Sequence, residues 1–184
     1  MYIILLGLSI FFGIHLVPGL VGLRRRIITS LGERPYQVLY SIISLIGLIL
    51  IVYGRSKAEF QPIWEPPVWS TDVAVVLMLP SFIFLASANM KSNIKRFTRH
   101  PMLWGVVLWS GAHLLANGDL ASLLLFGSFG AFSLFGMFSA NMRGATKQET
   151  KYPFTRDAVT IVAGLVAYGV FIFFHPYFFG ASVI

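Results

Sequence analysis

The chain has 184 residues, of which 57% are hydrophobic and only 11% are charged, and its formal net charge is +7. Soluble domains average roughly 25% charged residues, so this composition excludes an ordinary soluble fold and indicates an integral membrane protein. The sequence has no cysteine, which excludes disulfides, thiolate metal ligands, iron–sulfur clusters and a cysteine nucleophile.

Six apolar runs follow one another along the chain, and a transmembrane helix needs about 20 such residues. The runs cover residues 2–22, 36–53, 73–89, 102–116, 120–140 and 158–178. The fourth run is short, and only Asn117, Gly118 and Asp119 separate it from the fifth. These two runs are expected to form an antiparallel hairpin. The sequence therefore predicts an all-α fold, a bundle of six transmembrane helices in a single domain over residues 1–184.

The positive charges of the connecting segments predict the orientation. Of the 14 lysines and arginines, all but Arg55 and Lys57 lie in the first, third and fifth connections. Positive residues favour the cytoplasmic side, so both termini are expected on the outer, periplasmic side of a bacterial inner membrane. Contact with the lipid bilayer then accounts for the net charge, and no nucleic-acid partner is expected.

Two histidines are the ionisable residues that stand out within the predicted spans. No Lys, Arg, Asp or Glu lies in the middle of a span, whereas His15 and His113 lie about eight and about twelve residues from the cytoplasmic ends of theirs. Two neutral imidazoles can ligate a haem iron axially, and Trp109, Asn117 and Gly19 are candidates for the lining of such a pocket. The alternative is two unrelated histidines, each hydrogen-bonded to a neighbouring helix. Spacing alone leaves both interpretations open.

A basic cluster precedes the fourth span. Arg96, Arg99 and His100 come just before Pro101, which is expected at the first position of the helix. Such a cluster at a helix N-terminus suits an anion or a lipid headgroup. The alternative is that it anchors the topology and starts the helix.

Three stretches carry a family resemblance. They are Arg99-His100-Pro101 with Gly105, Trp109 and AHLLANGD at 112–119, then GIHLVPGLVGLRRRI at 13–27, and GERPYQVLYSIISLIGLILIVYG at 32–54. Together they resemble the NnrU family of small membrane proteins, which is named for its link to denitrification. The family is related to the 15-cis-zeta-carotene isomerases, which carry a similar R-H-P and A-H pattern. The segment after Met142 shows no convincing match.

The resemblance implies haem b, held through His15 and His113. It implies an inner-membrane protein that supports nitrite or nitric oxide reduction, together with a redox partner or other denitrification components. The alternative is a haem-dependent cis–trans isomerase that takes an apolar polyene, as the carotenoid isomerases do. The short chain favours the bacterial branch.

Two further readings stay open. One is a cofactor-free membrane scaffold in which both histidines are only hydrogen-bonded. The other is a relative of the isoprenylcysteine methyltransferases, which also carry R-H-P before a glycine. Those enzymes follow it with a paired-glutamate and tyrosine motif, and only Glu149 and Tyr152 stand near the equivalent place here.

Overall fold

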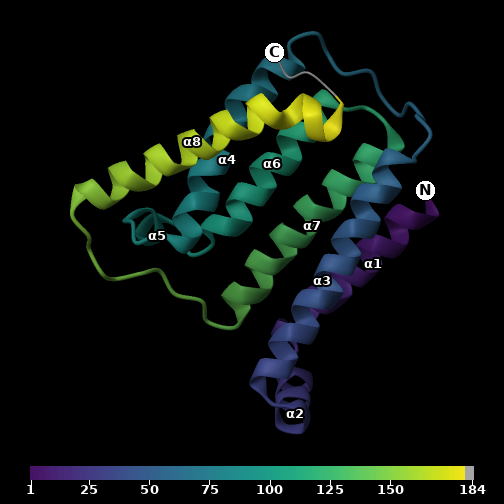
Figure 1. Cartoon of the computed structure of the whole chain (residues 1–184). Helices are drawn as coiled ribbons and strands as arrows, with labels where there is room; N and C mark the ends of the chain where they lie inside the picture. Colours follow the sequence, from purple (N-terminus) through teal and green to yellow (C-terminus); the bar gives the residue numbers. More distant parts are fainter. Residues whose placement is uncertain (181–184) are drawn as a thin grey trace. The chain divides into compact units, whose positions relative to one another are not determined.

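The computed structural model describes residues 1–180 and is helical (Figure 1). The helices are α1 (Tyr2–Leu16), the 3₁₀ turn η1 (Val17–Gly19), α2 (Val21–Leu31), α3 (Glu33–Ser56), α4 (Ser70–Asn89), α5 (Ile94–Phe97), α6 (Pro101–Ala116), α7 (Leu120–Met142) and α8 (Phe154–Phe179). The part of the chain that is described contains no strand, only an isolated bridge between Pro62 and Asp119. The prediction of an all-α fold is confirmed. The last four residues of the predicted domain lie outside the described residues.

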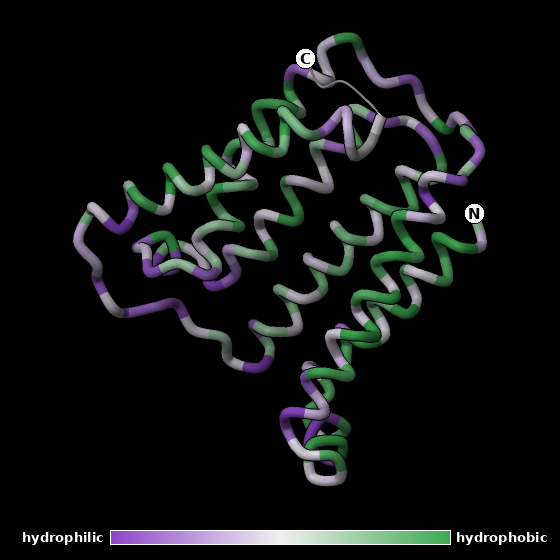
Figure 2. Tube along the Cα trace, in the orientation of Figure 1, coloured by the Kyte–Doolittle hydropathy of each residue, from purple (hydrophilic) through white to green (hydrophobic). Residues whose placement is uncertain are grey.

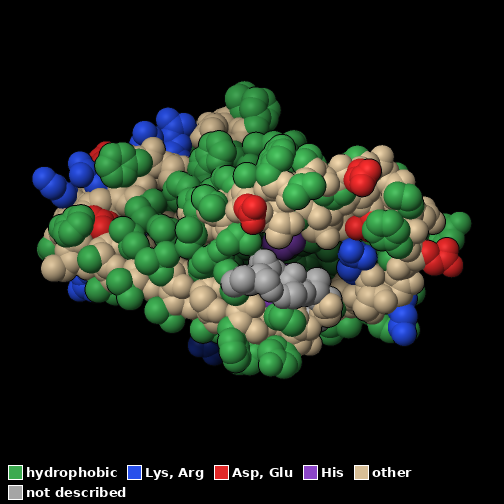
Figure 3. Space-filling view, turned by 90° about the horizontal axis from the view of Figure 1, so that it is seen from above, with side chains coloured by type: hydrophobic (Ala, Val, Ile, Leu, Met, Phe, Trp, Pro, Cys, Tyr) green, Lys and Arg blue, Asp and Glu red, His purple; other side chains and the backbone are tan. Residues whose placement is uncertain are grey.

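Within residues 1–180, five helices are long and apolar enough to cross a membrane. They fall at the first, second, third, fifth and sixth predicted runs, so the chain is a multi-pass membrane protein. Helix α6 is apolar but has only 16 residues. Large hydrophobic side chains are exposed along the helices, as Figure 3 shows for one face, and such exposure suits lipid better than water. The sixth crossing and the side of the termini stay predictions.

The first predicted span is wrong at its C-terminal end. Residues 2–22 were expected to form one helix, but α1 ends at Leu16 and a 3₁₀ turn follows. Pro18 has no N–H to donate and its ring obstructs the preceding turn, and the chain forms a 3₁₀ turn at this point. The chain then forms the separate helix α2, which carries basic residues and mixes hydrophilic with hydrophobic positions (Figure 2).

The contacts divide the chain into two units, each described by itself. Unit 1 comprises residues 1–63 and 119–128, and unit 2 comprises 64–118 and the chain from 129 onward. Helix α7 contributes its first turns to unit 1 and the rest to unit 2. The expected single domain stays a prediction.

Unit 1 is built on the antiparallel pair α1 and α3, whose backbones approach closely at glycines. A β-carbon at Gly7 would lie 2.7 Å from the backbone nitrogen of Ile51, and one at Gly47 would lie 2.9 Å from that of Phe11. Small residues allow such approach between membrane helices, where packing rather than the hydrophobic effect drives association. This pairing fixes the position of the end of α1.

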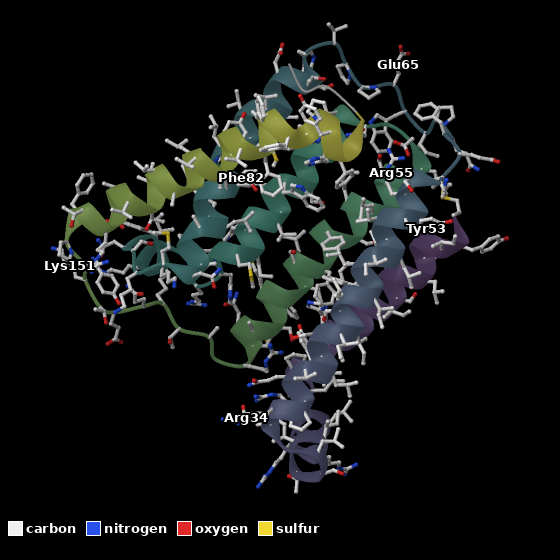
Figure 4. All side chains as sticks on the ribbon, in the orientation of Figure 1. Arg34, Tyr53, Arg55, Glu65, Phe82 and Lys151 are labelled. Atoms are coloured by element: carbon white, nitrogen blue, oxygen red, sulfur yellow. The ribbon has the colours of Figure 1, made fainter. Side chains whose placement is uncertain are left out.

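Unit 2 is built on α4, with α6 and α8 packed against it. The Ser81 hydroxyl donates to the carbonyl of Gly105 on α6 at 2.8 Å, and the Tyr168 hydroxyl of α8 donates to the carbonyl of Val75 at 2.9 Å. Phe82, labelled in Figure 4, packs against the ring of Tyr168, with 5.8 Å between centroids. Helix α6 is thus fixed from one side by a buried hydrogen bond.

The connections meet in pairs within the units. In unit 2 the amide of Gln148 donates to the carbonyl of Lys95 at 3.2 Å, which joins the third and fifth connections. In unit 1 the amide of Leu120 donates to the carbonyl of Gln61 at 2.9 Å, which joins the second connection to the start of α7. These bonds join connections within each unit, and the side of the membrane on which each lies stays a prediction.

Candidate functional site

His15 lies in the last turn of α1, in unit 1. Its Nδ1 is 2.6 Å from the carbonyl oxygen of Phe11, one helical turn earlier. The imidazole stacks on the Phe11 ring with 4.0 Å between centroids and 25° between planes, and the Tyr40 ring of α3 lies 5.3 Å away. The side chain is half-buried. Because α1 ends at Leu16, His15 lies nearer the end of its helix than the sequence predicts.

His113 lies in the last turn of α6, in unit 2. Its Nδ1 is 2.8 Å from the carbonyl oxygen of Trp109, again one turn earlier. The indole of Trp109 lies 5.1 Å from the imidazole and packs edge-on against Phe129 of α7 at 5.6 Å. The side-chain amide of Asn117 donates to the carbonyl of His113 at 2.8 Å. Trp109 and Asn117 are therefore neighbours of His113, and their place in the lining of a haem pocket stays a prediction.

Both histidines are held in the same tautomer by the same local device. A carbonyl oxygen can only accept, so in each case Nδ1 carries the proton and donates it. The neutral ring then has its lone pair on Nε2, the atom that can coordinate a metal. Histidines that bind metals usually donate their other N–H to a carbonyl or a carboxylate in this way. The tautomer of each imidazole is the one that a metal-binding histidine uses, and haem binding stays a prediction.

The two histidines belong to different units, so a shared iron stays a prediction. Gly19 lies in η1, four residues after His15, and its place in a pocket also stays a prediction. Among residues 1–180, no group of three or more His, Asp or Glu side chains is arranged as a metal site.

The basic cluster before α6 is engaged within unit 2. Pro101 is the first residue of the helix and His100 is its N-cap, as expected. The side-chain oxygen of Asn141 on α7 accepts from Arg99 at 3.0 Å and from Nε2 of His100 at 2.9 Å. These contacts favour the structural interpretation. Binding of an anion or a lipid headgroup by Arg96, Arg99 and His100 stays a prediction.

An apolar hollow of about 510 Å³ lies along α6 in unit 2. Trp64, Pro67, Leu77, Gly111, Leu114 and Leu115 line it. By helical spacing, Gly111 and Leu115 lie roughly opposite His113 on α6, because residues two apart differ by about 200° around the axis. A ligand in this hollow would therefore not reach the imidazole.

An ion pair in unit 1, between the buried Asp119 and the partly exposed Arg55, was missed by sequence reasoning. The side chain of Asp119 is 3% exposed and accepts from the Arg55 guanidinium at 3.3 Å. It also accepts from the Ser122 amide at 3.0 Å and from the Ser122 hydroxyl at 2.5 Å, which caps the first turn of α7. Burial alone would raise the pKa of Asp119, but the Ser122 hydrogen bonds and the Arg55 charge outweigh it and lower that pKa.

Two signals could have revealed this pair. Asp119 stands three residues before Ser122 at a helix start, which is a capping pattern. Arg55, labelled in Figure 4, is one of only two cations on the side that is otherwise free of them. Positive residues are disfavoured on the predicted outer side, so an arginine there suggests that it pairs with a particular carboxylate.

Comparisons with known proteins identify the family of the chain. The family described as "NnrU protein" matches residues 3–183. The 15-cis-zeta-carotene isomerase, chloroplastic, of Zea mays is 29% identical over 163 residues, which is 77% of this chain. The match covers 44% of the isomerase, so the chain spans less than half of that relative. No solved structure matches the chain. Because the family match covers nearly the whole sequence, the chain belongs to the NnrU family.

Proposed function

We propose that this protein binds haem b in the membrane, with His15 and His113 as the axial ligands of the iron. The observation that supports the proposal is the shared tautomer: both imidazoles donate Nδ1–H to a carbonyl one turn earlier. A bound haem would supply a redox-active iron. The bacterial inner membrane remains the expected location.

The residues around each histidine have definite tasks in this proposal. The carbonyls of Phe11 and Trp109 orient the rings and make Nε2 more basic. The flat side chains of Phe11, Tyr40 and Trp109 provide apolar surfaces that exclude water beside the ligands. Each task is local to one unit. In unit 1 it depends on the packing of α1 at glycines of α3, and in unit 2 on the buried hydrogen bond between Ser81 and α6.

Visible spectroscopy of the purified protein from haem-replete cells tests the proposal. We expect a Soret band and sharp reduced α and β bands, which are typical of two histidine ligands. Either His15→Ala or His113→Ala should abolish this spectrum if both share one iron, and added imidazole should restore it. His175→Ala, near the end of α8, tests whether this third histidine is a ligand, and it should leave the spectrum unchanged.

Other results would contradict the proposal. A folded but colourless wild type would exclude haem binding. A six-coordinate spectrum that survives one of the two alanine variants would exclude a shared iron. Loss of the spectrum in His175→Ala with retention in His15→Ala would assign the second ligand to His175.

A cis–trans isomerase acting on a polyene is the second candidate, and the name of the maize relative favours it. Conversion of a cis-carotenoid in a producing strain, measured by chromatography, tests it. Loss of conversion in His113→Ala would tie the activity to the haem. Absence of conversion by a haem-loaded protein would leave support of nitrite or nitric oxide reduction as the role to test, in a strain that lacks this protein.

A further inference from the structure

A second hollow, unrelated to the proposed haem site, lies on helix α2 in unit 1. Its volume is about 470 Å³, and Gly22, Arg25, Arg26, Thr29 and Ser30 line it. These residues recur at intervals of three and four, so they share one side of the helix. All five are exposed. The side chain is absent at Gly22, and no atom lies within 4 Å of the position that a β-carbon would occupy there.

The other side of α2 is apolar. Ile27 and Ile28 are half-buried, whereas Leu23 and Leu31 are 44% and 49% exposed. The helix begins two residues after the apolar stretch Tyr2–Gly19 ends. An amphipathic helix directly after a span lies at the level of the lipid headgroups. Figure 1 shows α2 at the foot of the α1–α3 pair.

The three consecutive arginines of α2 have different surroundings. Arg24 points away from the hollow: its guanidinium lies over the Tyr36 ring at 5.9 Å and is 3.9 Å from Glu33. Arg25 and Arg26 line the hollow instead. The structure thus uses one arginine to fix α2 on α3 and directs the next two toward open space.

We infer that this hollow binds the phosphate of an anionic phospholipid headgroup. Guanidinium groups match phosphate oxygens in a bidentate manner, and Arg25 and Arg26 supply two of them. The missing side chain at Gly22 leaves room for the phosphate between them. The apolar side of α2 and its position directly after a span favour a lipid over free phosphate.

Native mass spectrometry of the purified protein, titrated with phosphatidylglycerol or phosphatidylcholine, tests the inference. We expect tighter binding of phosphatidylglycerol. Each cation near an anionic headgroup contributes roughly fivefold, so Arg25→Gln with Arg26→Gln should weaken that binding by about 25-fold. Gly22→Leu fills the hollow without a change of charge and should also weaken the binding of phosphatidylglycerol.

Matched variants separate the site from general effects. Gly169→Leu places the same side chain in open space on α8 and should leave lipid binding unchanged. Equal affinity for the two lipids, or full affinity of both Gly22→Leu and the double arginine variant, would overturn the inference. Displacement of phosphatidylglycerol by millimolar inorganic phosphate would overturn the assignment to a lipid, because it would show a site for the free anion.

Discussion

The surroundings of His15 and His113 repeat one local design in two different settings. In each, an aromatic residue one turn earlier offers its carbonyl to Nδ1. The ring of Phe11 also stacks on His15, whereas the ring of Trp109 is tilted by 50° from His113 and packs on Phe129 of another helix. The tautomer is therefore a property of the helix alone, and the packing around the ring is a property of the unit.

The largest expected difference between the two regions comes from the helix contact beside His15. Gly47→Ala would place a carbon within 2.9–3.0 Å of Phe11 atoms, and such overpacking should cost about 3 kcal/mol of stability. Gly13→Ala, two residues before His15, meets no atom within 4 Å and should stabilise α1 by roughly 0.5–1 kcal/mol. Thermal unfolding in detergent measures both. Equal melting temperatures would show that this close approach does not hold α1.

The ion pair at Asp119 belongs to the region of His15 and not to that of His113. Asp119 follows His113 by six positions in the sequence, yet it packs in the unit that contains His15. Asp119→Ala removes the capping bonds and leaves Arg55 without its carboxylate, and should cost about 2–3 kcal/mol. Ser122→Ala retains the ion pair and should cost about 1 kcal/mol. Unfolding curves of the two variants test this order, and a larger loss in Ser122→Ala would contradict it.

The stability of the protein at acid pH should depend on the carboxylate of Asp119. The folded-state pKa of Asp119 is lowered, so its stabilising contribution is complete above the unfolded value of about 3.9 and is lost as the pH falls through the folded pKa. The melting temperature of the wild type should therefore decline below about pH 4 more steeply than that of Asp119→Asn. Parallel declines would assign acid sensitivity to other carboxylates.

The smallest expected effects concern the rings themselves. Phe11→Leu and Trp109→Leu both keep the backbone carbonyl, and each removes aromatic contacts of about 0.5–1.5 kcal/mol. We expect both variants to bind haem with ligand spectra like the wild type and with severalfold weaker affinity. Titration of the haem-free protein measures this. Loss of the spectrum in either variant would show that the ring, and not the carbonyl, positions the ligand.

Much of the architecture was predictable from the sequence because hydropathy records where lipid replaces water. The start of α6 was also predictable, since Pro101 can only begin a helix there. The break after Leu16 was missed because the sequence stays apolar through Gly22, and hydropathy does not register a proline turn. The Arg55–Asp119 pair was missed because 64 residues separate the two side chains, and only the fold brings them together.

The candidate site was predictable in part. The residue types of His15 and His113, and the proximity of Trp109 to the second, follow from helical spacing. The contact of His15 with Tyr40 does not, because it depends on the register between α1 and α3 that Gly7 and Gly47 set.

The turn at Gly118 has a consequence for how the second connection is held. A β-carbon at Gly118 would overlap the carbonyl oxygen of Trp64, and the amide of Trp64 donates to the Gly118 carbonyl at 3.1 Å. The backbone of the second connection therefore rests directly on the residue that follows α6 and its C-cap. A side chain at position 118 would force these two backbone segments apart, so the absence of a side chain there ties a long connection to the end of a short helix.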